Sequence, residues 1–81
     1  MEIIVHRINN IKLLKKIPTN FGIEIDIRSY KSKLILNHEP YKSGDSLDSF
    51  LKNYKHGTLI LNIKEAGIEK DVIKKVNKKK N

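Results

Sequence analysis

The sequence predicts an α/β fold with about four strands and three helices in one small domain. Short apolar runs rich in β-branched residues alternate along the chain with segments whose apolar residues recur at helical spacing. Residues that favour turns separate these segments, and neither an internal repeat nor a linker divides the chain. With 81 residues, the chain can bury one small core.

The expected strands are residues 2–6, 23–28, 34–37 and 58–63. The first contains the β-branched run Ile3-Ile4-Val5, which is typical of a buried strand. The second alternates apolar and polar residues, so its isoleucines face one way and Glu24, Asp26 and Arg28 face the other. The short link at residues 30–33 allows an antiparallel hairpin between the second and third strands, although we favour largely parallel pairing across the sheet.

Each expected helix follows a residue that favours a helix start or a turn. Asn9 or Asn10 caps the first helix, which ends before Pro18. Ser46 caps the second, whose apolar face consists of Leu47, Phe50, Leu51 and Tyr54. Gly67 precedes the third, whose apolar positions are Ile68, Val72, Ile73 and Val76.

The chain carries 17 Lys and Arg residues against nine Asp and Glu, which gives a formal net charge of +8. All of these basic residues except Arg7 and Arg28 are lysines, and the few aromatic residues are not interleaved with them. Proteins that read bases rely on arginine forks, and single-strand binders rely on stacking aromatics, so nucleic acid is not the favoured partner. Residues 77–81 form a lysine-rich tail beyond a domain that comprises residues 1–76.

The chain has no cysteine, which excludes both a disulfide framework and a thiolate metal site. No apolar run approaches the ~20 residues of a membrane span. The N-terminus lacks the basic start and the small-residue cleavage site of a signal peptide. We therefore expect a cytoplasmic protein.

Polar clusters lie at the ends of the expected strands or within them. His6-Arg7 follows the first strand, Glu24-x-Asp26 lies in the second, and His38-Glu39 follows the third. Glu24 and Asp26 are two residues apart on a strand, so their carboxylates emerge on the same face. Two imidazoles can activate water and protonate a leaving alkoxide, while carboxylates can hold a hard cation against a phosphate. This combination suits hydrolysis of a phosphodiester.

The order of these motifs resembles the glycerophosphodiester phosphodiesterases, which are similar in kind to the phosphatidylinositol-specific phospholipases C. In the family, one strand ends in His-Arg-Gly, the next carries Glu-x-Asp, a His-Asp pair follows, and a later strand has the form Glu-Ile-Lys. The matching segments here are His6-Arg7, Glu24-x-Asp26, His38-Glu39-Pro40 and Asn62-Ile63-Lys64. The resemblance covers roughly residues 3–65, which is most of the chain.

The resemblance implies that the substrate is a glycerophosphodiester, which is hydrolysed to glycerol phosphate and an alcohol. His6 and His38 would form the catalytic acid/base pair, and Arg7 and Lys64 would contact the substrate phosphate.

The resemblance also implies a divalent metal cofactor, Mg²⁺ or Ca²⁺, with Glu24, Asp26 and Asn62 as its ligands. The implied fold is a TIM-type (β/α) barrel, and this chain would form an incomplete N-terminal part, because a whole barrel takes ~250 residues. We therefore expect activity to require missing barrel segments or a homo-oligomer. An open part-barrel would also expose a strand edge, which predicts self-association or marginal stability.

The chain departs from the family pattern at several positions. Ile8 replaces the Gly after His-Arg, and no Glu-Asn-Thr segment follows. The His-Asp pair is His38-Glu39, and Asn62 stands where a third acidic metal ligand is usual. A site with one fewer negative charge should bind a divalent cation more weakly.

Two other functions remain open on the sequence. The chain can be a catalytically silent remnant or scaffold, or a small basic module that binds nucleic acid or an anionic surface. The basic module would require its lysines to gather on one face and its binding to weaken with salt. Among the remaining polar residues, we interpret His56 as part of a turn and Tyr41 as a packing residue.

Overall fold

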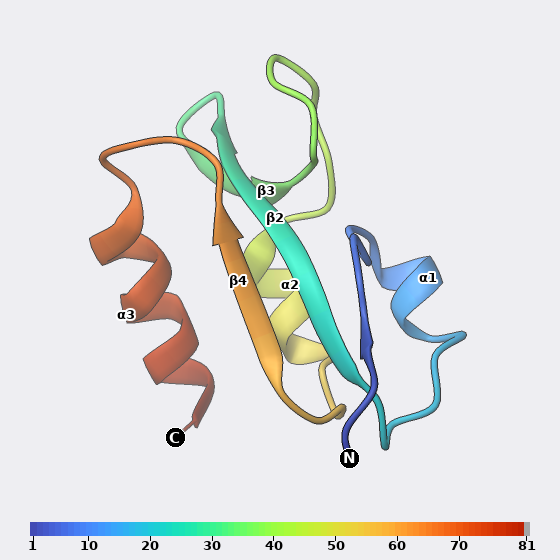
Figure 1. The fold of residues 1–81 in the computed structure, drawn as a ribbon. Helices are drawn as coiled ribbons and strands as arrows, with labels where there is room; N and C mark the ends of the chain where they lie inside the picture. Colours follow the sequence, from blue (N-terminus) through green and yellow to red (C-terminus); the bar gives the residue numbers. More distant parts are fainter. Residues whose placement is uncertain (81) are drawn as a thin grey trace.

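The computed structural model describes residues 1–80, with side chains placed through Lys78. Within this range the chain forms a small α/β fold with four strands and three helices, as the sequence predicts (Figure 1). The strands are β1 (Ile4–Val5), β2 (Gly22–Tyr30), β3 (Lys33–Leu36) and β4 (Leu59–Ile63). The helices are α1 (Ile11–Leu14), α2 (Leu47–Lys52) and α3 (Glu69–Lys80).

The strands form one open, mixed sheet with β2 at its centre. Ile23 of β2 pairs in parallel with Val5 of β1 and with Leu59 of β4, so these two strands lie on opposite edges of β2. Ile27 of β2 pairs with both β3 and β4, which places β3 on the same edge as β1, farther along β2. The parallel strands are therefore neighbours in chain order: β1, β2, β4.

The link between β2 and β3 is a two-residue hairpin turn. Lys31 and Ser32 both have positive φ, at 50° and 67°, and Tyr30 pairs with Lys33 directly across the turn. Two consecutive left-handed residues are the mark of a type I′ turn, whose twist matches that of an antiparallel ribbon. The parallel pairing favoured from the sequence is wrong at this link, and the hairpin alternative is correct.

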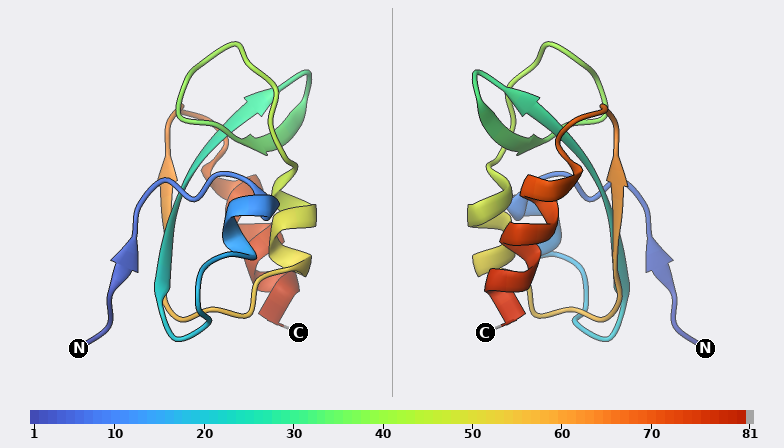
Figure 2. Two further views of the ribbon diagram at one scale, coloured as in Figure 1. Left: turned by 90° about the vertical axis from the view of Figure 1, so that its right-hand side faces the viewer. Right: turned by 90° about the vertical axis from the view of Figure 1, so that its left-hand side faces the viewer.

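All three helices cover the same face of the sheet (Figure 2). The isoleucines of β2 face this layer and are completely buried, as their alternation predicts. They belong to a hydrophobic core that comprises Ile8, Leu14, Ile23, Ile25, Ile27, Leu36, Leu47, Phe50, Leu51 and Val72. No helix of residues 1–80 lies on the opposite sheet face, and we call it the open face (Figure 2).

Strand β1 is short and lies at the sheet edge, so the prediction of a buried first strand is wrong. Ile4 and Val5 are half-buried, and Ile3 is 56% exposed. Only the first two residues of β2 pair with this strand, and Ile3 precedes it, with its carbonyl oxygen accepting a hydrogen bond from the N–H of Gly22 at 2.8 Å. Gly22 allows the close approach here, because a Cβ at this position would overlap the Ile4 side chain and lie 2.9 Å from the Thr58 carbonyl oxygen.

Helix caps follow the sequence pattern, with α1 shorter than expected. Asn10 caps α1 by accepting a hydrogen bond from the backbone N–H of Leu13, and Ser46 caps α2 in the same way. Helix α3 continues to Lys80, through most of the segment expected to be a tail, and Asn81 lies outside the described residues. The three helices of residues 1–80 lack the length and hydrophobicity that a membrane span requires.

Candidate active site

The polar residues of β2 face away from the helices, onto the open face. Glu24 and Arg28 are half-buried there, whereas Asp26 is only 1% exposed. The segments that follow β1, β3 and β4 supply His6, His38 and Lys64 to the same region. Residues that are distant in the sequence therefore meet around two carboxylates on one strand.

His6 and Glu24 form the first histidine–carboxylate pair. The Nδ1 atom of His6 lies 3.2 Å from Oε1 of Glu24. The histidine side chain is 69% exposed and that of Glu24 is 20% exposed. Glu24 can orient the imidazole through Nδ1, which leaves Nε2 available to solvent or to a ligand.

Asp26 is the centre of the second cluster. Its Oδ2 accepts a hydrogen bond from Asn9 Nδ2 at 2.9 Å, and its backbone N–H donates to Asn9 Oδ1 at 2.8 Å. Lys64 Nζ lies 3.7 Å from Oδ1, and His38 Nδ1 lies 3.7 Å from Oδ2. A buried carboxylate needs such partners, because burying an unpaired charge is strongly unfavourable.

Arg28 holds the backbone of the His38 segment in place. Its Nε and Nη2 atoms donate to the carbonyl oxygen of His38 at 3.2 and 2.9 Å. The Nδ1 atom of His38 is shielded from solvent and makes no hydrogen bond within the described residues. The carboxylate that forms an ion pair with it is that of Asp26. At 3.7 Å the two atoms are too far apart for a hydrogen bond, and a small ring movement would close one.

The remaining predicted site residues divide into one that joins this cluster and one that does not. Asn62 of β4 pairs with Asp26 in the sheet register, so its side chain lies on the same face. Arg7 is exposed, with φ of 55°, and makes no hydrogen bond or ion pair through its side chain within the described residues. Its left-handed backbone lies directly after β1, beside His6.

The oxygen donors fit a hard divalent cation in kind but are few in number. Glu24 and Asp26 offer carboxylates and Asn62 offers an amide oxygen, the ligand types that Mg²⁺ and Ca²⁺ take. Within residues 1–80, however, no three His, Cys, Asp or Glu side chains form a group that could hold a metal. The ammonium of Lys64 beside Asp26 also competes with a cation for that carboxylate.

Sequence reasoning missed the supporting residues of the site. Asn9 was considered only as a helix cap, but Asn10 fills that role and Asn9 binds Asp26. The sequence placed Arg28 on the same strand face as Glu24 and Asp26. It did not predict the two hydrogen bonds from the Arg28 guanidinium to the His38 carbonyl oxygen, because they depend on a loop that has no sequence signature.

Glu65, directly after Lys64, fastens the end of β4 to β2. Its two carboxylate oxygens accept hydrogen bonds from the backbone N–H of Ser29 at 2.6 Å and from the Ser29 hydroxyl at 2.8 Å. These bonds favour the charged form, so they hold the pKa of Glu65 below its ordinary value of 4.5. This clamp fixes the strand end from which Lys64 extends.

Two further residues named from the sequence lie outside the cluster. The Nε2–H of His56 donates a hydrogen bond to the carbonyl oxygen of Ile17 at 2.8 Å, and the His56 ring lies near that of Tyr54, which agrees with a structural role in a turn. Tyr41 is 94% exposed, so the prediction that it packs is wrong. Tyr41 lies in the loop between β3 and α2, with a positive φ of 63°, and its side chain does not enter the core.

Comparisons of the chain with protein-family models, with curated proteins and with solved structures find no match. The geometry of the open face is therefore the basis for a functional proposal.

Proposed function

We propose that the open face carries a phosphodiester hydrolase site of the glycerophosphodiester phosphodiesterase kind. The observation that supports it is the pairing of two histidines with two carboxylates on one strand face, His6 with Glu24 and His38 with Asp26. A contribution to stability is a weak explanation for the two histidine–carboxylate pairs. Exposed ion pairs contribute little to stability, and buried ones have a high desolvation cost.

In this proposal the two histidines share the proton transfers. One imidazole takes a proton from the attacking water and the other donates a proton to the leaving alkoxide. Glu24 orients His6 at 3.2 Å, and Asp26 would orient His38 once the ring closes the 3.7 Å gap between them. Each carboxylate stabilises the imidazolium form of its histidine. The exposed ring of His6 and the less exposed ring of His38 face the open side of the sheet, from which a diester can approach.

Positive groups around the carboxylates would bind the phosphate. Lys64 is 26% exposed beside Asp26, and Arg7 extends from the end of β1. A divalent cation held by Glu24, Asp26 and Asn62 would offset the phosphate charge when bound. The site residues themselves supply the proton transfers and the orientation of the substrate.

We further propose that the fold corresponds to the opening units of a (β/α) barrel. Strands β1, β2 and β4 are parallel, lie side by side in chain order, and are followed by α1, α2 and α3 in turn. All three helices lie on one face, as they would on the outside of a barrel, whereas doubly wound sheets have helices on both faces (Figure 2). The β2–β3 hairpin would be an addition to this pattern, and further barrel segments or a second copy would cover the open face.

Metal-dependent release of glycerol phosphate tests the proposed activity. The chain is incubated with glycerophosphodiesters of different alcohols, with Mg²⁺ or Ca²⁺, over a wide range of protein concentrations. We expect release that rises faster than linearly with protein concentration and that is lost in His6→Ala and in His38→Ala. His56→Gln is the matched histidine control, since His56 lies outside the site.

Release that persists in both histidine variants would contradict the proposed roles. If no release occurs at any concentration and neither metal binds, the chain is a catalytically silent scaffold instead.

A further inference from the structure

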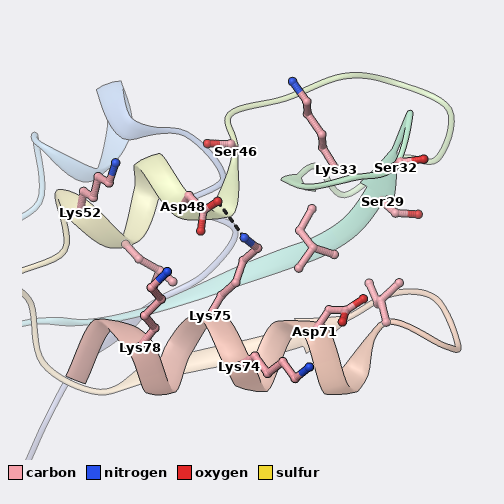
Figure 3. Close-up of a pocket in the computed structure, with 13 residues that line it drawn as sticks. Ser29, Ser32, Lys33, Ser46, Asp48, Lys52, Asp71, Lys74, Lys75 and Lys78 are labelled. Atoms are coloured by element: carbon pink, nitrogen blue, oxygen red, sulfur yellow. Dashed lines mark hydrogen bonds and ion pairs between the residues drawn. The ribbon is translucent and has the colours of Figure 1, made fainter. Parts of the chain in front are cut away.

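A groove on the helical side of the molecule lies between α2, α3 and the β2–β3 hairpin (Figure 3). Its volume is about 1310 Å³, and it is separate from the candidate active site, whose residues lie on the open face of the sheet. Helix α3 forms one wall, and α2 with the start of β3 forms the other.

Lysines dominate the charged lining of this groove. They are Lys33, Lys52, Lys74, Lys75 and Lys78, against two acidic residues, Asp48 and Asp71. Lys75 spans the groove and donates a hydrogen bond to Asp48 at 2.8 Å, as Figure 3 shows. The other four lysines make no ion pair within the described residues, so the groove has an excess of positive charge.

The charges are unevenly distributed along the groove. In Figure 3, Lys52 and Lys78 lie at the end near the C-terminus of α3, whereas Asp71 and Ser29 lie toward the hairpin. Helices α2 and α3 both end near Lys52 and Lys78, and the partial negative charge of the two helix C-termini opposes an anion there. The full charges of two lysines without an ion pair among the described residues outweigh these partial charges, whereas at the hairpin end Asp71 offsets Lys33. An anion can therefore bind more favourably at the Lys52–Lys78 end.

The same groove has an apolar component. Leu34, Leu51 and Ile68 line it, and these side chains also belong to the core or pack against it. Among the residues whose side chains the structure describes, no aromatic side chain and no arginine lines the groove. An apolar wall beside a lysine-rich end is the arrangement that binds an amphiphile with an anionic head, because lysine stems cover apolar surface while their ammonium groups contact charge.

We propose that this groove binds a single-chain lipid whose head is a phosphate monoester. Five lysines against two aspartates leave more positive charge in the groove than the single charge of one carboxylate would neutralise. A phosphate monoester carries about −1.5 to −2 charges and three acceptor oxygens. The head contacts Lys52 and Lys78, and the acyl chain runs along Leu34 and Ile68 toward the hairpin. Nucleic acid fits less well, because the groove offers no aromatic side chain for stacking.

This inference does not rest on the proposed hydrolase site, and the two can be tested separately. Binding of oleoyl lysophosphatidic acid below its micellar concentration is measured by calorimetry at fixed salt. The comparison ligands are oleoyl lysophosphatidylcholine, which has the same chain and a zwitterionic head, and glycerol 3-phosphate, which has the head without the chain. We expect lysophosphatidic acid to bind at least tenfold more tightly than either, and shorter acyl chains to bind progressively more weakly.

Variants then locate the site. We expect Lys52→Gln with Lys78→Gln to weaken binding of lysophosphatidic acid roughly tenfold or more, because two head contacts are lost. The matched control, Lys12→Gln with Lys16→Gln, removes the same charge from exposed positions outside the groove and should change binding less than about twofold. All of these measurements use protein that also carries His6→Ala and His38→Ala, because the proposed hydrolase site would itself bind a glycerol phosphate head.

Several results would overturn the proposal. Equal affinity for glycerol 3-phosphate and lysophosphatidic acid would show that the apolar wall is not used. Equal loss in the groove and control variants would show that only net charge matters. Tighter binding of a single-stranded oligonucleotide or of an acidic peptide at the same salt would assign the groove to that partner.

Discussion

The buried carboxylate of Asp26 allows the clearest test of how the site is held together. Asp26→Asn keeps the shape of the side chain and removes its charge. The change converts the hydrogen bond from Asn9 into a neutral one and leaves Lys64 without its anionic partner. We expect this substitution to destabilise the fold much more than Glu24→Gln does.

The magnitude follows from the distances and the burial. At 3.7 Å and an effective dielectric constant of about 20, the attraction between Asp26 and Lys64 is about 4.5 kcal/mol before desolvation. Relief of the desolvation of Asp26 offsets part of this, and Lys64 can be hydrated because it is 26% exposed. With the weakened hydrogen bond included, the expected net loss is about 2–3 kcal/mol. For Glu24→Gln the expected loss is below about 1 kcal/mol, because His6 is largely exposed.

Urea denaturation followed by circular dichroism at neutral pH measures both values. For a chain of this size, a loss of 2–3 kcal/mol corresponds to a fall in melting temperature of roughly 8–24 °C. The double variant with Lys64→Gln should recover part of the loss, because it removes the unpaired ammonium. If Asp26→Asn and Glu24→Gln differ by less than about 0.5 kcal/mol, the reasoning that Asp26 is the anchor of the site is wrong.

Three further predictions test other parts of the account. Lys64→Gln should tighten Mg²⁺ binding roughly tenfold or more in calorimetry, because the competing ammonium is gone, and Asp26→Asn should abolish Mg²⁺ binding. Weaker Mg²⁺ binding in Lys64→Gln would contradict this competition. Because its pKa is lowered in the fold, Glu65 stabilises the protein above its unfolded pKa, and this contribution is lost as the pH falls through the lower folded pKa. Ser29→Ala removes the hydroxyl bond but keeps the backbone N–H bond, so it should raise the Glu65 pKa part of the way toward 4.5 in a carboxyl NMR titration; an unchanged value would show that the hydroxyl bond does not contribute. The open sheet face and the free edge of β4 predict that the melting temperature rises with protein concentration, whereas a concentration-independent melt of a monomer above ~60 °C would contradict it.

The fold class followed from the sequence because alternation and helical spacing are local signals. The period-two pattern at residues 23–28 assigned the isoleucines of β2 to the core and Glu24, Asp26 and Arg28 to the other face. The hairpin has no local sequence signal, because its turn uses Lys31 and Ser32 in left-handed conformations, where Asn-Gly would be the usual pair.

The sequence predicted that the histidine and carboxylate motifs would lie close together, but not which histidine would pair with which carboxylate. That His6 lies beside Glu24 and His38 beside Asp26 depends on the sheet register and on the loop after β3, which are long-range features. The role of Asn9 depends on the path of the chain between β1 and α1, for which the sequence has no local signature. Burial of Asp26 follows from these loops as well, since period-two alternation alone would leave it as exposed as its neighbours on the open face.

The groove on the helical side also depends on tertiary structure. The sequence assigned residues 77–81, and with them Lys78, to a lysine-rich tail beyond the third helix. The structure places Lys74, Lys75 and Lys78 in one helix that lies against α2. Lys33 and Lys52 reach the same groove from segments distant in the chain. Sequence alone gives their number, and only the packing of the helices brings them together.

A titration that resolves the three histidine rings tests the central claim most directly. Glycerol 3-phosphate is added to protein with ¹⁵N-labelled histidines, and the ring signals are followed by NMR. The account predicts that His6 and His38 shift together with a single dissociation constant, while His56, bonded to Ile17 O, does not move. Independent shifts of His6 and His38, or an equal shift of His56, would show that the two histidine–carboxylate pairs do not form one phosphate site.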